Sequence, residues 1–160
     1  MLRQTKDLQD LAISATDGAI GDVKDFYFDD EAWAIRYIVV ETGSWLSSRK
    51  VLISPIAAEK PDWAAKLLPV RLTREQVKNS PAIDTDMPVT RQHETDYLDY
   101  YGYPYYWGGM GLWGAAEYPG MLLPGYVSDA AARADTDSVQ ARTEAHRRDQ
   151  DPHLRSCKAV

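Results

Sequence analysis

The carboxylates near the start of the chain come closest, in type and spacing, to a catalytic arrangement. Asp22, Asp25, Asp29 and Asp30 lie within one short stretch. Two carboxylates in different environments can work as a general acid and a general base. These four, however, fall at turns and at alternating positions of a predicted hairpin, which is typical of a solvated charged face. We therefore predict no catalytic residue among them.

The other candidates for metal binding or nucleophilic chemistry are weaker. Asp84 and Asp86 resemble the start of a calcium loop, but the glycine and the distal glutamate of such a loop are missing. His93 and Glu94 are sequence neighbours, which do not face each other on a helix, so we expect a surface pair. Cys157 is the single cysteine and cannot form an internal disulfide. It predicts a lone exposed thiol in a reducing, cytoplasmic compartment. We predict no metal and no cofactor.

Charge and hydropathy exclude two classes of partner. The formal net charge is −6, and no segment has the surplus of Lys and Arg with which proteins bind a phosphate backbone. We therefore exclude nucleic acid. No apolar run approaches the ~20 residues of a membrane-spanning helix, and residues 1–10 contain no hydrophobic signal core. Direct membrane insertion is not expected.

The elements that must position any site are short antiparallel strands between residues 12 and 55. The Asp17-Gly18 pair predicts a two-residue type I′ hairpin turn, between a strand over residues 12–15 and one over 19–28. Val23 breaks the period of two, which favours a bulge beside it. The next strand begins at Trp33, with Trp33 and Tyr37 facing the core and Arg36 facing the other way. A further strand covers residues 50–54.

Three runs of this stretch resemble the PRC-barrel domain: TDGAIGDVKDFYFDD, WAIRYIVVETGSWL and RKVLISP. The resemblance covers roughly residues 1–80. It implies a mainly β fold, a small six-stranded barrel, and for most stand-alone members no known enzymatic activity. The family is named after the cytoplasmic domain of the photosynthetic reaction-centre H subunit and includes the barrel of a ribosome-maturation factor. These relatives imply a role at a membrane complex or on a ribosomal protein.

The rest of the chain predicts little regular structure. Thr73 to Gln76 form a capping box and predict one short helix that ends before Pro81. Residues 81–150 are expected to be a linker and tail, with an aromatic, glycine-rich part at 97–126 and a polar part at 128–150. No helical or strand period is evident in the aromatic part. Two interpretations stay open for it: a flexible tail, or a segment that docks on its own barrel or on another chain.

The end of the chain echoes its beginning. His153-Leu154-Arg155-Ser156-Cys157-Lys158 repeats the Leu, Arg and Lys of Met1-Leu2-Arg3-Gln4-Thr5-Lys6 in register. Proteins that resemble this one often carry two barrels in tandem. We therefore predict that residues 151–160 are the start of a second barrel repeat that the sequence does not include.

Together these features predict a non-enzymatic protein-interaction or assembly module in the cytoplasm, bound to a protein partner or to itself as a homodimer. Tyr and Trp provide large contact areas at low entropic cost. The expected partner-binding residues are Trp45, Leu46, Tyr105, Tyr106, Trp107 and Trp113. The alternative is a barrel that binds a small metabolite, or acts on one, at a mouth near Trp45.

Overall fold

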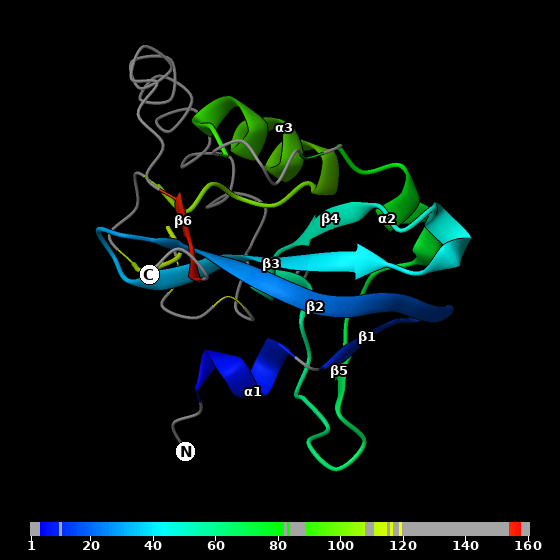
Figure 1. Cartoon of the computed structure of the whole chain (residues 1–160). Helices are drawn as coiled ribbons and strands as arrows, with labels where there is room; N and C mark the ends of the chain where they lie inside the picture. Colours follow the sequence, from blue (N-terminus) through cyan, green and yellow to red (C-terminus); the bar gives the residue numbers. More distant parts are fainter. Residues whose placement is uncertain are drawn as a thin grey trace.

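The computed structural model describes residues 4–9, 11–81, 83, 89–107, 111–114, 116, 119 and 154–157. Its elements follow one another along the chain as shown in Figure 1. They are α1 (Thr5–Gln9), β1 (Ala12–Ala15), β2 (Gly18–Asp29), β3 (Ala34–Thr42), η1 (Ser44–Leu46), β4 (Lys50–Ile53), η2 (Pro55–Ala57), β5 (Leu67–Pro69), α2 (Arg74–Lys78), α3 (Arg91–Tyr101) and β6 (Leu154–Ser156).

The six strands of the described residues form one sheet in the order β4-β3-β2-β1-β5, and β6 pairs with β2. All pairs are antiparallel except β1 with β5. The mainly β fold is therefore confirmed. The closed barrel is not confirmed, because β4 and β5, the two end strands of this order, do not pair with each other. β5 is only three residues long and ends in Pro69, which has no N–H to extend a ladder.

The inner face of the sheet holds the main hydrophobic core. Ile13, Val40, Val51 and Ile53 are fully buried there. Val77 of α2 joins the same cluster, so the short helix is held by packing rather than by its own stability. The predicted helix is confirmed, with its capping box at Thr73.

The first hairpin is confirmed, but its turn lies one residue earlier than predicted. Ala15 pairs with Gly18, so Thr16 and Asp17 form the turn. Gly18 itself has a φ of +149°, a conformation that L residues rarely adopt. The sequence therefore identified the glycine that the turn needs and misplaced it by one position.

Bulges in the β2–β3 hairpin decide which side chains reach the outer face. Tyr27 pairs with Tyr37, whereas Phe28 pairs with Ile35, which leaves Arg36 as an extra residue. A bulge breaks the alternation of side chains, so Arg36 shares the outer face with Tyr37. The prediction that they face opposite ways is wrong. The irregularity expected beside Val23 is present, since the register also shifts between Val23 and Asp25.

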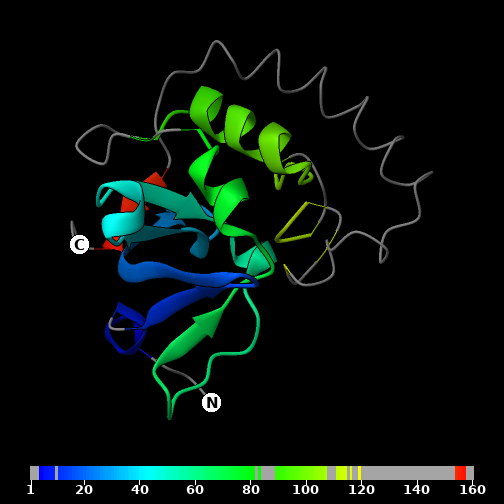
Figure 2. The same ribbon diagram turned by 90° about the vertical axis from the view of Figure 1, so that its right-hand side faces the viewer.

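The sequence analysis predicted one short helix, after Thr73, and missed α3. Its residues Tyr97 and Leu98 pack against Tyr37, Val39 and other side chains of the outer face. Figures 1 and 2 both show α3 on the opposite side of the sheet from α1. The apolar stripe of α3 is narrow and interrupted by charged residues, which is why it gave no clear helical period.

The end of α3 depends on one glycine. Gly102 has a φ of +67°, and the Tyr103 N–H donates to the Leu98 carbonyl at 2.9 Å, as in a Schellman motif. We expect Gly102→Ala to lower the free energy of unfolding by about 1 kcal/mol, because alanine is strained at positive φ. Urea denaturation measures this. Gly43→Ala is the control, since Gly43 has a φ of −71° and should tolerate alanine; an equal loss in both variants would contradict the prediction.

Candidate functional site

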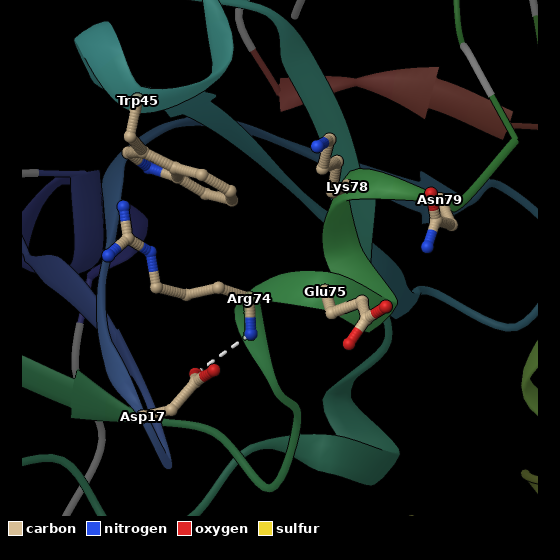
Figure 3. Close-up of a pocket in the computed structure, with 6 residues that line it drawn as sticks. All are labelled: Asp17, Trp45, Arg74, Glu75, Lys78 and Asn79. Atoms are coloured by element: carbon tan, nitrogen blue, oxygen red, sulfur yellow. Dashed lines mark hydrogen bonds between the residues drawn. The ribbon is translucent and has the colours of Figure 1, made fainter.

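Trp45 lies beside a shallow hollow on the surface of the protein (Figure 3). The hollow has a volume of about 450 Å³. Its lining comes from the β1–β2 turn, from η1 and from α2, and comprises Asp17, Trp45, Arg74, Glu75, Lys78 and Asn79. Two acidic and two basic side chains balance each other in charge, which suits contact with a polar surface or ligand.

Trp45 is fixed in place rather than free. Its indole N–H donates to the Ile20 carbonyl at 2.7 Å, and the Arg74 guanidinium lies 4.3 Å from the ring centroid. The Arg74 backbone N–H in turn donates to the Asp17 carboxylate at 2.8 Å, as Figure 3 shows. Trp45 and Leu46 are both half-buried and pack against the inner core. Both therefore belong to the edge of the inner core, and Trp45 also lines the hollow.

The other four predicted residues lie together on the outer side of the sheet. We call residues 103–107, 111–114 and 116 the aromatic loop. In it, Tyr105 stacks on Trp107 at 4.9 Å, and Tyr106 contacts Trp107 at 4.9 Å and Trp113 at 6.4 Å. Tyr106 and Trp113 are buried beside Ile56 of η2. The described part of this segment therefore packs on the sheet of its own chain, while the rest of the segment lies outside the described residues.

Arg36 holds the aromatic loop to the sheet. The side chain is 3% exposed. Its guanidinium lies 3.9 Å from the centroid of the Tyr106 ring and 5.0 Å from that of Trp113. It donates to the Leu112 carbonyl at 2.6 Å and to the Asp29 carboxylate at 3.2 Å. The bulge in β3 thus directs a buried cation at a cluster of aromatic rings, an arrangement that favours cation–π contact.

Asp29 completes this arrangement from the end of β2. Burial raises the pKa of Asp29, but backbone hydrogen bonds from Glu31 and Ala32 and the contact with Arg36 outweigh it and hold the pKa below its ordinary value. Its carboxylate accepts from the Glu31 N–H at 2.9 Å and from the Ala32 N–H at 3.2 Å. Asp29 is therefore a structural anion that orders the β2–β3 turn and pairs with Arg36.

Glu94 of α3 is buried between the helix, the sheet and the aromatic loop, with 1% of its surface exposed. Its Oε1 accepts from the Tyr37 hydroxyl at 3.1 Å and from the Tyr106 hydroxyl. Its Oε2 lies 3.2 Å from Arg91 Nη1, but without hydrogen-bond geometry. Burial raises the pKa of Glu94 to about 7, although Arg91 and the tyrosine hydrogen bonds oppose it. The prediction of a surface His93–Glu94 pair is wrong for Glu94, while His93 is exposed.

Trp33 is the exposed residue that the sequence analysis did not select for binding. It lies in the turn before β3, is 76% exposed and has a φ of +54°, so the expectation of a core residue is wrong. Its ring stacks on Phe28 at 5.4 Å. A left-handed conformation is costly for a bulky residue and often marks a functional position. The polar residues that precede Trp33 were the available signal, since they place it in a turn.

The C-terminal strand β6 lies against the same hairpin. Its Leu154 pairs with Asp29 and its Ser156 with Tyr27. Cys157, expected to be exposed, is half-buried, and burial together with Asp25 raises the pKa of its thiol. The prediction that a second barrel repeat begins at residues 151–160 is not tested by this pairing, and nor are the domain boundaries at residues 80 and 150.

Residues 5–65 match the family model of the PRC-barrel domain. No curated protein matches the chain. Among the helices of the described residues, none has the length and apolar character needed to cross a membrane.

Proposed function

Because this chain contains a PRC-barrel domain at residues 5–65, we propose that it is a non-enzymatic, cytoplasmic interaction module that assembles with other proteins. One observation carries the proposal. The sheet binds two polypeptide segments from outside those residues: α3 with the aromatic loop on its outer face, and β6 along β2. Strand addition and aromatic docking are recurring ways in which domains bind peptides.

The chemistry of these surfaces supports a protein partner. Arg36 and Arg91 lie over rings of the aromatic loop, at 3.9 Å from Tyr106 and 4.0 Å from Trp107. Tyr, Trp and Arg are the residue types enriched at binding hot spots. The cytoplasmic setting of the proposal is based on the single cysteine, and the resemblance implies that the partner belongs to a membrane complex or is a ribosomal protein.

Trp33 is the residue that we propose contacts the partner. It is large, mostly exposed, and held in one orientation by Phe28. A preorganised aromatic side chain loses little entropy on binding. Its backbone N–H donates to the Asp29 carbonyl at 2.8 Å, and Asp29 in turn pairs with Leu154 of β6 and accepts from Arg36.

A photo-cross-linking residue at position 33 tests this proposal in the native cell. We expect capture of a specific protein that the same residue at the exposed position of Lys60 does not capture. The captured protein, once purified, should bind the chain saturably, and Trp33→Ala should weaken binding about 30-fold, the effect of losing a 2 kcal/mol hot spot. Equal capture at both positions, or an unchanged affinity, would contradict the proposal.

The hollow beside Trp45 favours a second candidate, a binding site for a small polar metabolite. Its volume and its mixed charges are the supporting observation. Thermal-shift screening against metabolites separates the candidates. A saturable shift that Trp45→Ala abolishes, and that Trp63→Ala leaves in place, would favour the metabolite site over the interaction module.

A further inference from the structure

β2 is much longer than the strand that pairs with it on the β1 side. β2 has 12 residues and β1 has four. β1 covers β2 only from Gly18 to Asp22. Further along the same strand, Tyr27 to Asp29 pair with β6. Without β6 this part of β2 would be a sheet edge, whose free N–H and C=O groups readily pair with another chain.

Each of the three residues of β6 makes a different contact with the rest of the protein. Leu154 is 5% exposed and packs with Tyr27 and Tyr37 on the outer face. Arg155 Nε lies 2.9 Å from the Asp30 carboxylate. The Ser156 hydroxyl donates to the Asp25 carboxylate. The β2 edge therefore accepts an apolar side chain, a cation and a hydroxyl in that order.

β6 is attached to the sheet by few stabilising contacts. The strand is only three residues long, and the side chains of Arg155 and Asp30 are 60% and 33% exposed. Exposed ion pairs contribute little to stability, so one buried leucine and a short ladder account for most of the contact. Elements held by so few buried contacts open more readily than the core.

We propose that the β2 edge from Asp25 to Asp30 is a strand-addition site for a protein segment with an apolar–basic–hydroxyl pattern, and that Leu154–Ser156 is the occupant that the chain itself supplies. This inference rests on the proposed function and gives the chemistry of its partner. In strand addition the backbone supplies affinity and alternating side chains supply specificity. The Asp30 carboxylate selects a basic residue at the second position of the pattern, and the Asp25 carboxylate selects a hydroxyl at the third.

Peptide binding to the full-length protein tests the site. In Leu154→Asp the apolar anchor is lost and the edge becomes free. A fluorescent peptide with the sequence of residues 151–160, with serine in place of its cysteine, should bind this variant saturably in an anisotropy titration. The wild-type chain should bind the peptide at least tenfold more weakly, because its tethered strand competes at an effective concentration of the order of millimolar. Circular dichroism and urea denaturation establish that the variant is folded.

A charge exchange tests the register. In the Leu154→Asp protein, Asp30→Lys should weaken the peptide about fivefold, and a peptide with glutamate in place of its arginine should recover most of that loss. The neighbouring Glu31 is also exposed and is the matched control. Glu31→Lys should not favour the glutamate peptide, and equal recovery in both variants would overturn the predicted pairing.

Three results would overturn the inference. The first is the absence of saturable binding to a folded Leu154→Asp protein. The second is equal affinity for the variant and the wild type, which would place the peptide elsewhere. The third is a wild-type dimer in light scattering that Leu154→Asp dissociates, which would show that β6 comes from a second copy. None of these affects cross-linking through position 33, so this inference can fail while the proposed function holds.

Discussion

Replacing Arg36 with alanine is expected to destabilise the protein by about 3–5 kcal/mol, the usual cost of removing one partner from a buried ion pair. The substitution leaves Asp29 without its cation and the Leu112 carbonyl without its donor. It also removes the group over which Tyr106 and Trp113 pack. Urea denaturation followed by far-UV circular dichroism measures the loss.

A substitution in an exposed ion pair shows how much of the expected loss of stability depends on burial of the charge. Lys24 pairs with Glu41 at 3.2 Å, but the two side chains are 42% and 39% exposed. We expect Lys24→Ala to cost less than about 1 kcal/mol, because solvent screens such a pair. If Arg36→Ala costs no more than Lys24→Ala, Arg36 does not hold the aromatic loop and our description of the outer face is wrong.

The stability of the protein is expected to fall as the pH rises from 5 to 8. The pKa of Glu94 is about 7 in the folded protein, whereas the ordinary value, which applies to the unfolded chain, is 4.5. The folded state therefore binds the proton more tightly than the unfolded state, and protonation stabilises the fold. This stabilisation is complete below pH 4.5, declines through the window up to pH 7 and is lost above it. The shift corresponds to about 3 kcal/mol.

The variant Glu94→Gln identifies the group responsible. Glutamine resembles the protonated carboxyl and cannot ionise, so the difference between wild type and variant isolates the titration of Glu94. The free energy of unfolding, measured in urea at pH 5, 6, 7 and 8, should decline in the wild type and stay nearly level in the variant. Parallel profiles would show that Glu94 does not titrate in this range. Asp29, whose pKa is lowered, loses its stabilising effect only on acidification below about pH 4, near its ordinary pKa, which is outside these measurements.

The strands of the first hairpin were predictable because their signals are local. β1 and β2, and β3 after them, were located to within a residue or two. Their signals are a glycine that a turn requires, alternating apolar residues and β-branched side chains. The capping box at Thr73 is equally local, since the Thr73 hydroxyl accepts from the Gln76 backbone N–H and the Gln76 side chain accepts from the Thr73 backbone N–H, within four residues. The family resemblance rests on the same stretch, which is why the match at residues 5–65 confirmed it.

The candidate site was predictable only in part. The aromatic residues of the loop were selected as a segment able to dock, because so much aromatic surface is costly to leave in water; their binding of a partner stays a prediction. Arg36, Glu94 and Trp33 were each misplaced. A single bulge turned Arg36 to the outer face, and a turn one residue longer than expected left Trp33 in solvent. Periodicity alone cannot locate such irregularities, since each changes the face of one residue without changing the pattern around it.

By itself, the sequence determined a mainly β fold with a resemblance to the PRC-barrel domain, its first hairpin and the helix after Thr73. Only the tertiary structure decided that Glu94 is buried, because its partner Tyr37 lies 57 residues away, and that Leu154–Ser156 pairs with β2, because Arg155 lies 125 residues from Asp30. Turns and caps are settled by neighbours along the chain. A buried charge or an added strand is settled by groups that meet only once the sheet has formed.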